Sequence, residues 1–299
     1  ALSGTGSVTV NGGELALGVT SQSVGVVTVN GGLVSGGVLS GTEYRVRSGE
    51  ISGVLAGGAG LTKTTAGLAT LSGRNTYSGD TVVEAGVLGL AVDGAISGAS
   101  RVQVRGGELS LGATSQSVLA LTLDGGLVRG GRLEAMTTTL LKGDLDTVLF
   151  GVGTVEKSGA GLVDLTGRIE VSGGLTVSGG TLRLASEDRI GDGVRLTMDG
   201  GVLDLNGTVE TVGRVRLRGG DLVNGSLLST AFELESGTVS TVFGGTGSLV
   251  KTTSGEVILN SVNTYLVAGA LPLVIGRSWR LACCDWGSMV HCQRRQVSR

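Results

Sequence analysis

The chain has 299 residues, of which 57 are glycine, one is proline and 40% are hydrophobic, and its formal net charge is −2. This balance excludes collagen, which needs glycine at every third position with abundant proline, and it excludes a disordered chain. It also gives no basic footprint for nucleic acid, and no apolar stretch reaches the roughly 20 residues of a membrane-spanning helix. Valine, leucine and threonine dominate between the glycines, which predicts an all-β fold.

The opening segment, ALSGTGSVTV, lacks the basic start and apolar core of a signal peptide, so we expect the chain to be part of a longer one.

An internal repeat of 94 residues runs through the chain from this segment onward. The segment VTVNGGELALG at 8–18 returns as VQVRGGELSLG at 102–112 and as LTMDGGVLDLN at 196–206. Self-similarity at a fixed period is the signature of a repeat architecture, so the three copies are predicted to fold alike.

Each copy contains a shorter period of about 19 residues, which is itself a repeat. Turn glycines mark this period at Gly12, Gly31, Gly49, Gly67, Gly86 and Gly106. Short alternating strands lie between them, such as ELAL at 14–17 and VVTV at 26–29. This period is too short for a four-stranded propeller blade. It predicts a right-handed parallel β-helix (a β-solenoid), in which each coil pairs with the next about 4.8 Å away.

Residues 60–90 carry the most specific motif, GLTKTTAGLATLSGRNTYSGDTVVEAGVLGL. This segment resembles the autotransporter-associated β-strand repeat, also called the passenger-associated transport repeat. That family's pattern reads G-x-L-x-K-x-G-x-G-x-L-x-L-S-G-x-N-T-Y-[ST]-G-x-T-x-V-x-x-G-x-L-x-L. The motif residues of the first copy are Lys63, Gly67, Leu71, Gly73, Asn75, Thr76, Tyr77, Gly79, Thr81 and Gly86. The later copies keep Lys157, Gly180, Lys251, Asn263 and Tyr265.

The resemblance implies a β-helical passenger domain of a bacterial autotransporter, exported through the periplasm to the cell surface or secreted. In that family the repeat is associated with secretion and folding rather than with catalysis. The implied partner is a β-barrel translocator in the full-length protein, and a host-cell or matrix surface is the expected adhesion partner. We expect no cofactor, no nucleic acid and no direct membrane insertion of this segment. A two-partner-secreted haemagglutinin would share the fold, but its usual repeats lack Asn-Thr-Tyr-Ser-Gly.

Outward positions along the predicted strands carry polar and charged side chains. Arg214, Arg216 and Arg218 alternate with apolar residues, so they are predicted to form the solvent-facing side of one strand rather than a nucleic-acid site. Asn206 and Asn224 fit the glycosylation pattern Asn-x-Ser/Thr. Because each precedes a glycine, they are predicted instead to form corners with a positive φ.

The repeat pattern ends after Tyr265. Residues 266–299 hold the only proline, both tryptophans, all three cysteines and the only histidine of the chain. Two adjacent cysteines followed by His-Cys, within 283–292, match no usual zinc spacing, so no metal site is predicted. We predict a β-helical passenger fragment over 1–265, and an aberrant, poorly ordered tail over 266–299 that is non-native, from a shifted reading frame or a junction after Tyr265.

Clustered acids give the alternative function, a solenoid enzyme that cleaves polysaccharides. The candidates are Asp144 and Asp146 on a predicted outward face, and Glu187, Asp188 and Asp192 in a predicted turn. Neither set has a histidine partner or a long loop that could build a cleft. We therefore predict a non-catalytic stalk that serves surface display, secretion-coupled folding and adhesion. An enzyme, or the stalk of an autotransporter hydrolase whose catalytic part lies elsewhere, is the alternative.

Overall fold

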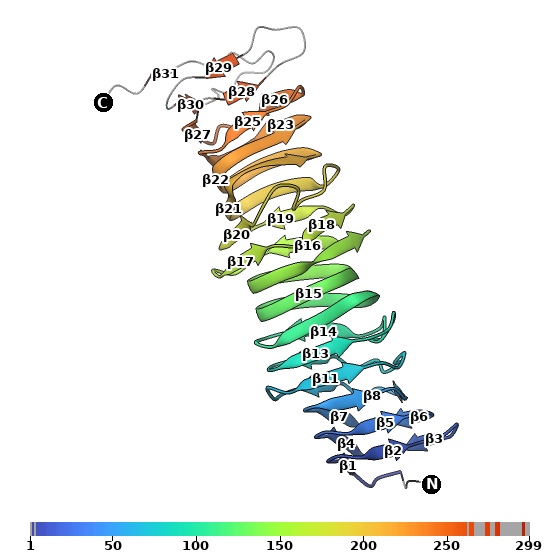
Figure 1. Cartoon of the computed structure of the whole chain (residues 1–299). Helices are drawn as coiled ribbons and strands as arrows, with labels where there is room; N and C mark the ends of the chain where they lie inside the picture. The colour runs from blue at the N-terminus through green and yellow to red at the C-terminus, as the bar shows by residue number, and fades with distance from the viewer. Residues whose placement is uncertain are drawn as a thin grey trace. The chain divides into compact units, whose positions relative to one another are not determined.

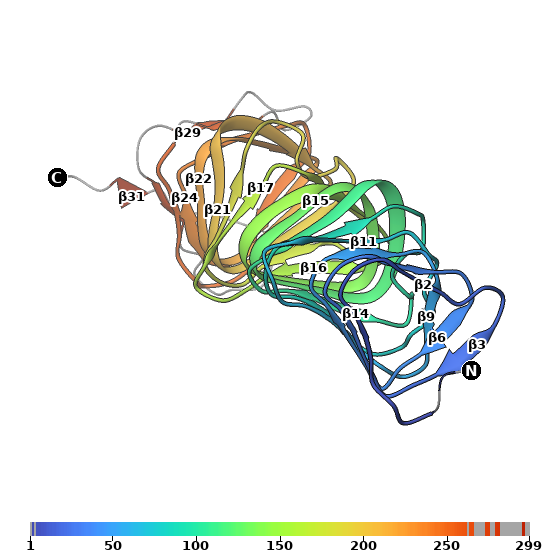
Figure 2. The same ribbon diagram turned by 60° about the horizontal axis from the view of Figure 1, so that its bottom comes forward.

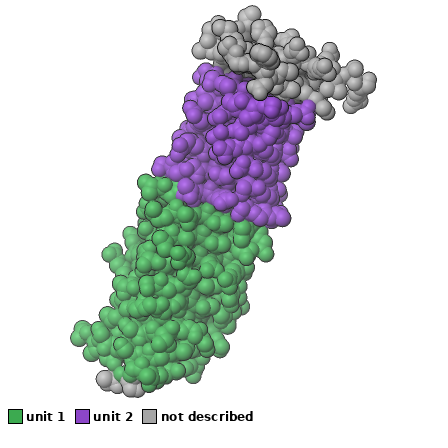
Figure 3. Space-filling model, turned by 180° about the vertical axis from the view of Figure 1, so that it is seen from behind, with its two compact units in different colours: residues 1–153 green, residues 154–299 purple. Residues whose placement is uncertain are grey.

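The computed structural model describes residue 2, residues 4–261 and the backbone of four short strands at 263–265, 273–275, 279–281 and 295–296. The chain divides into two compact units, residues 1–153 and residues 154–299 (Figure 3). Among the described residues both units consist of strands and turns. The predicted boundary at residue 265 and the cysteines, histidine and tryptophan between 282 and 292 lie outside the described side chains, so these expectations stay predictions.

The first unit is a stack of short strands that wind in coils (Figure 1). Its strands are β1 (Val8–Val10), β2 (Glu14–Ala16), β3 (Ser21–Ser23), β4 (Val26–Val29), β5 (Leu33–Ser35), β6 (Val38–Ser40), β7 (Glu43–Val46), β8 (Gly49–Ile51), β9 (Val54–Ala56), β10 (Leu61–Lys63), β11 (Leu68–Leu71), β12 (Thr81–Val83), β13 (Val87–Leu90), β14 (Arg101–Val104) and β15 (Glu108–Gly151). Strands β3, β6 and β9 form a separate sheet along one flank (Figure 2). Strand β15 spans 44 residues, longer than any single coil, and it turns through corners at positive-φ glycines such as Gly112 and Gly130.

The second unit is built in the same way. Its strands are β16 (Thr154–Lys157), β17 (Leu162–Leu165), β18 (Arg168–Val171), β19 (Leu175–Val177), β20 (Thr181–Leu184), β21 (Arg195–Val212), β22 (Arg214–Ser229), β23 (Ala231–Leu234), β24 (Gly237–Val239), β25 (Val242–Gly244), β26 (Ser248–Lys251), β27 (Val257–Leu259), β28 (Asn263–Tyr265), β29 (Leu273–Ile275), β30 (Trp279–Leu281) and β31 (Arg295–Gln296). Parallel pairing continues through β24 with β27, whereas β27 pairs antiparallel with β30.

Parallel pairing between successive coils confirms the predicted β-solenoid. In the first unit one interior column runs through Val8, Val27, Tyr44, Leu61, Thr81, Val102 and Leu121. In the second unit the equivalent column runs through Val155, Leu175, Leu196, Val215, Phe232 and Leu249. From Val27 to Leu121 and from Val155 to Phe232 the column residues are at most 2% exposed, so each coil contributes one side chain to a narrow core.

The coils differ in length in a fixed order. In the first unit the two shortest coils lie within 27–61, and the longest spans 81–102. The second unit repeats this order, with its shortest coils within 215–249 and its longest over 175–196. Five coils of unequal length therefore make up the 94-residue repeat.

Positive-φ corners separate the strands, as the sequence indicates. Asn206 has a φ of 52° and Asn224 a φ of 57°, so both occupy the left-handed region as predicted. The glycine spacing predicted that Gly49 follows Gly31 in the turn column. Gly49 lies beside Gly32 instead, because either glycine of a Gly-Gly pair can occupy the turn.

The outward face predicted for one strand of the second unit is confirmed. Val215 and Leu217 on β22 are buried in the core. The arginines that alternate with them, Arg214, Arg216 and Arg218, lie at the surface. The alternation of apolar and charged residues along this strand therefore marks its two faces.

Candidate functional site

A buried lysine caps a turn in each copy of the motif. Lys63 is fully buried at the end of β10, and its Nζ donates to the carbonyl oxygens of Thr65 and of Ala85, the latter at 3.0 Å. Lys157 is equally buried at the end of β16. Its Nζ donates to the oxygens of Ser158 at 2.8 Å, Gly159 at 3.2 Å and Gly179 at 2.9 Å. Each ammonium group thus joins the turn of its own coil to the next coil.

The third lysine also caps the turn of its own coil, but its second partner lies in the preceding coil. Lys251 is 5% exposed, and its Nζ donates to the carbonyl oxygens of Thr253 and of Glu235, the latter at 2.9 Å. Burial lowers the pKa of Lys63 and of Lys157, since removal from water disfavours the charged form. The carbonyl oxygens satisfy the ammonium donors, so these lysines act as turn caps inside the coil rather than as reactive groups facing a cleft.

Glycine is required where the lysine reaches the next coil. Gly86 has a φ of 67°, and a Cβ there would lie 2.1 Å from the oxygen of Thr65. Gly180, its equivalent in the second copy, has a φ of 60°, and a Cβ there would lie 2.6 Å from the Nζ of Lys157. The Lys and Gly positions of the motif therefore form one structural unit. The sequence shows that they recur at equivalent positions, but only the structure shows why glycine is needed there.

Asn75 joins three successive coils. Its Oδ1 accepts a hydrogen bond from the backbone N–H of Leu55 at 2.8 Å, in the preceding coil. Its Nδ2 donates to the oxygen of Ala95 at 2.6 Å, in the following coil, and to Gly73 at 3.2 Å. Asn75 is 4% exposed, whereas the next motif residue, Thr76, is exposed. The asparagine thus adds side-chain links to both adjacent coils, beside the backbone bond from the N–H of Thr76 to the oxygen of Leu55 at 2.8 Å.

Tyr77 completes the polar cluster in the first copy. The phenol shares a hydrogen bond of 2.7 Å with Thr81 Oγ1, and both side chains are fully buried. Its ring packs against Tyr44, with centroids 6.0 Å apart and a tilt of 54°. Burial raises the pKa of Tyr77 far above its usual range, so the phenol stays neutral.

The second copy fills the same interior places with apolar side chains. Ile169, Val171 and Leu175 are the 94-residue repeat equivalents of Asn75, Tyr77 and Thr81, and all three are at most 3% exposed. There the backbone makes the link, since the N–H of Ile169 donates to Arg189 O and its carbonyl accepts from Gly191 N, both at 2.8 Å. The two copies therefore link this corner to adjacent coils in different ways, one through polar side chains and the other through the backbone.

The other motif residues line the same coil. Leu71 is fully buried, and a Cβ on Gly73 or on Gly79 would lie 2.4 Å from backbone atoms of the coil before. Gly67 lies before β11, where a Cβ would lie 3.0 Å from Ser48 Cβ. Asn263 and Tyr265 of the third copy lie in β28, of which only the backbone is described.

A second polar column, which recurs once in each copy, was not recognised from the sequence. Gln22, Gln116 and Glu210 each accept a backbone hydrogen bond from the coil before, from Leu2 at 2.7 Å, Ile96 at 3.2 Å and Ile190 at 2.9 Å. Glu210 also accepts one from the N–H of Arg189 at 3.1 Å. Burial raises the pKa of Glu210. The equal spacing of Gln22, Gln116 and Glu210 was the available signal, but only the structure shows that all three bond to the backbone of the preceding coil.

The acidic candidates do not converge on one site. Asp144 and Asp146 are exposed on either side of the buried Leu145, as the alternating pattern predicted. Glu187 and Asp192 lie exposed in turns. Asp188 has a φ of 61° and forms an ion pair of 2.5 Å with Arg168. Among the described residues no group of three or more His, Cys, Asp and Glu is placed to hold a metal ion.

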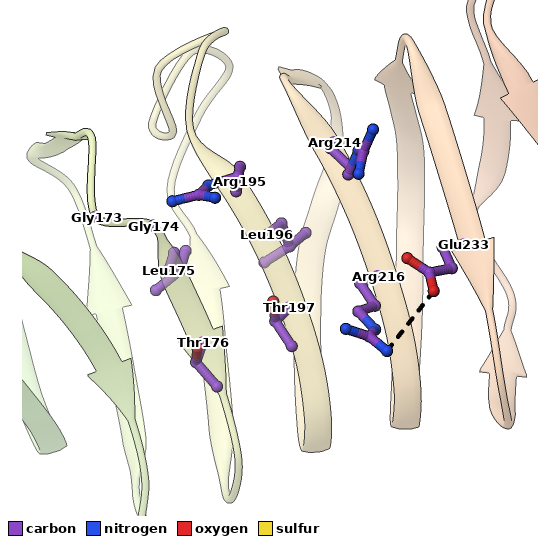
Figure 4. A pocket seen from close by; sticks show the side chains of 10 residues that line it. All are labelled: Gly173, Gly174, Leu175, Thr176, Arg195, Leu196, Thr197, Arg214, Arg216 and Glu233. Carbon is purple, nitrogen blue, oxygen red and sulfur yellow. Dashed lines mark ion pairs between the residues drawn. The ribbon is translucent and has the colours of Figure 1, made fainter.

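A hollow of about 230 Å³ on the outer face of the second unit is lined by three arginines and one acid. Figure 4 shows Arg195 on β21, Arg214 and Arg216 on β22, and Glu233 on β23. Arg216 forms ion pairs with Glu233 at 3.6 Å and with Glu235 at 2.7 Å. The sequence did not point to Arg195, because its neighbour in space, Arg214, lies one coil later in the chain.

One curated protein matches part of the chain. It is the "Adhesin BmaC autotransporter" of Brucella suis biovar 1 (strain 1330), 34% identical over 140 residues. The chain is similar to an autotransporter adhesin. The match covers 43% of this chain but 4% of the relative, so the chain spans only a small part of that protein's length. No family model and no solved structure matches the chain. Residues 4–261 contain no helix with the length and hydropathy needed to cross a membrane.

Proposed function

We propose that this chain is a non-catalytic β-solenoid stalk in the passenger part of an autotransporter, displayed at the bacterial surface. The observation that carries the proposal is the similarity to an autotransporter adhesin in a chain that folds as stacked parallel coils. The Asn-Thr-Tyr-Ser-Gly motif at 75–79 supports the same assignment. A β-barrel translocator in the full-length protein is the partner that this assignment requires.

The coil construction suits folding during export. Lys63 and Asn75 form their hydrogen bonds within their own coil and with directly adjacent coils, and each strand pairs with its equivalent in the next coil. A coil that emerges from a translocator can therefore fold on the coil already formed, without waiting for a distant segment. Completed coils would also resist movement back through the barrel. Secretion-coupled folding is the role that follows from this, and adhesion is the role that the relative's name suggests.

The experiment places the 299-residue chain between a signal peptide and a β-barrel translocator in a Gram-negative bacterium. Protease access to whole cells measures the rate at which the chain reaches the surface. We expect the wild-type chain to reach the surface, and we expect Asn75→Ala to slow its arrival several-fold, because two hydrogen bonds to adjacent coils and one within its own coil are lost.

Thr76→Ala provides the matched control, since Thr76 is the adjacent motif residue and its side chain is exposed. This variant should reach the surface as fast as the wild-type chain. Failure of the wild-type chain to be displayed would contradict the stalk proposal. Equal rates for Asn75→Ala and Thr76→Ala would contradict the coupling of folding to export.

A further inference from the structure

The hollow on the second unit has unneutralised positive charge. Arg195 and Arg214 are register partners on β21 and β22, so their Cα atoms are about 4.8 Å apart. Two other outward arginines nearby meet acids: Arg183 pairs with Asp164 at 2.6 Å, and Arg218 lies 3.6 Å from Glu235. Among the described residues, neither Arg195 nor Arg214 has an ion pair.

The neighbours in the same outward column explain why these two guanidinium groups lack partners. On one side lies Gly174, where an added Cβ would be 3.6 Å from the Cβ of Arg195. On the other side lies Ala231, which precedes Phe232, the register partner of Val215. Glycine and alanine offer neither a carboxylate nor bulk. The column therefore leaves space beside the arginines, and that space is the hollow of Figure 4.

The remaining lining of the hollow includes one acid and two hydroxyl groups. The acid, Glu233, is paired with Arg216 at 3.6 Å. Thr176 and Thr197 are register partners on β19 and β21, half-buried beside the arginines, and present hydroxyl groups to the outer face. Leu175 and Leu196 also border the hollow, but each is 1% exposed because its side chain lies in the core. Little apolar surface borders the hollow, which disfavours a protein partner, because the centre of a protein interface is mostly apolar.

We propose that Arg195 and Arg214 bind a sulfate or carboxylate group of an acidic polysaccharide, with the Thr176 and Thr197 hydroxyls binding the adjoining sugar oxygens. The planar guanidinium group matches both anions through paired N–H donors, and two such groups in register double the local charge. This inference rests on the proposed surface role and names the chemical class of its partner.

The test measures binding of the purified 299-residue chain to three immobilised polymers: heparin, which is sulfated, hyaluronate, which carries only carboxylates, and dextran, which is neutral. We expect binding to heparin that weakens as salt is raised, and no binding to dextran. Binding to hyaluronate as well would show that a carboxylate suffices, whereas binding to heparin alone would assign the site to sulfate.

Charge-matched double variants locate the site. Arg195→Gln with Arg214→Gln should weaken heparin binding at least tenfold. The control, Arg45→Gln with Arg105→Gln, removes the same charge from the first unit, where these side chains are 54% and 52% exposed. It should change heparin binding less than twofold. All proteins should melt at similar temperatures.

Absence of heparin binding by the wild-type chain, or equal losses in both double variants, would overturn the assignment. Surface display of the Arg195→Gln, Arg214→Gln variant separates this inference from the proposed function. Normal display with lost heparin binding supports both, whereas normal display of a wild-type chain that does not bind heparin rejects the polysaccharide site alone.

Discussion

Buried polar side chains that bond to the backbone are the residue-scale feature of this solenoid. Lys157 has no acidic partner among the contacts of its Nζ, which are three carbonyl oxygens from two coils. A corner of a coil leaves backbone carbonyls without strand partners, and a buried unpaired carbonyl is costly. The long lysine side chain reaches these oxygens from the core side. The charge is tolerated because three dipoles converge on it.

Lys157→Met should therefore destabilise the chain by about 2–4 kcal/mol, since it leaves buried carbonyl oxygens without a donor. Urea titration followed by far-ultraviolet circular dichroism measures the change. The control is Lys142→Met, because Lys142 is 59% exposed and lies 3.7 Å from Asp124. The control should lose less than about 0.5 kcal/mol of unfolding free energy, as an ordinary surface substitution does. A loss equally small for the Lys157 variant would contradict the turn-cap role.

Glu210 gives the second residue-scale prediction. Burial raises its pKa above the ordinary 4.5, the nearby Asp188 carboxylate acts in the same direction, and the N–H groups of Ile190 and Arg189 oppose both. A carboxyl group whose pKa is higher in the folded state favours folding when it is protonated. The wild-type chain should thus gain stability from this group as pH falls from neutral through the raised pKa, with no further gain below the unfolded value.

The melting temperature of Glu210→Gln relative to that of the wild-type chain should therefore be higher at pH 7 than near pH 4.5, because only the wild-type chain carries the buried carboxylate at neutral pH. Gln116→Glu, at the equivalent place of the preceding copy, should lower the melting temperature at neutral pH and introduce the same pH dependence. Melting curves between pH 4 and pH 8 test both variants. A difference that does not change with pH would refute this account.

The identity of the residues alone predicted only some of these contacts. The 94-residue spacing marked Lys63 and Lys157 as equivalent, but a lysine in a β-strand pattern is ordinarily an outward residue, and here it is buried. The Asn-Thr-Tyr-Ser-Gly motif contains Asn75 but does not reveal the three hydrogen-bond partners of its side chain. Arg195 was missed because its significance depends on Gly174 and Arg214, which lie one coil before it and one coil after it.

Coils are the elements of this fold, and their unequal lengths have a physical cause. The two longest coils of the first unit, within 61–102, include the Asn-Thr-Tyr corner and the turns at 93–100. The shortest coils, within 27–61, join the columns through short corners. Parallel pairing fixes the strands, and extra residues enter at the corners, where the surface accommodates them. Glycine spacing predicted the mean coil length well, but it could not predict which glycine of each pair forms the turn.

A glycine substitution tests the corners. Gly86→Ala should lower the melting temperature by several degrees, because its Cβ would lie 2.1 Å from the oxygen of Thr65 at a positive φ. Gly58→Ala is the matched control, since a Cβ at Gly58 meets no atom within 4 Å. Thermal melting of the two variants side by side measures the difference. Equal melting temperatures would show that the Lys63 turn relaxes freely, contrary to the structure.

At the scale of the whole molecule, the central claim is that the chain is a stack of modular coils. Each unit holds its own interior column, and the buried polar groups described here bond within one coil or to directly adjacent coils. The all-β fold and the three copies of the 94-residue repeat could be predicted from the sequence, because both depend on local patterns. Coil boundaries did not, because they depend on which strands pair, and this is settled by contacts between residues one coil apart.

The most direct measurement compares two deletions in the first unit. Removing residues 32–48 takes out one complete coil, so that Gly49 follows Gly31 and Leu61 becomes the neighbour of Val27 in the column. Removing residues 32–40 takes out about half a coil and moves inward side chains out of register. The account predicts that the whole-coil deletion keeps the β-type circular dichroism spectrum and a single melting transition near that of the wild-type chain, while the shorter deletion melts far lower. Equal melting temperatures for the two deletions would contradict the modular register.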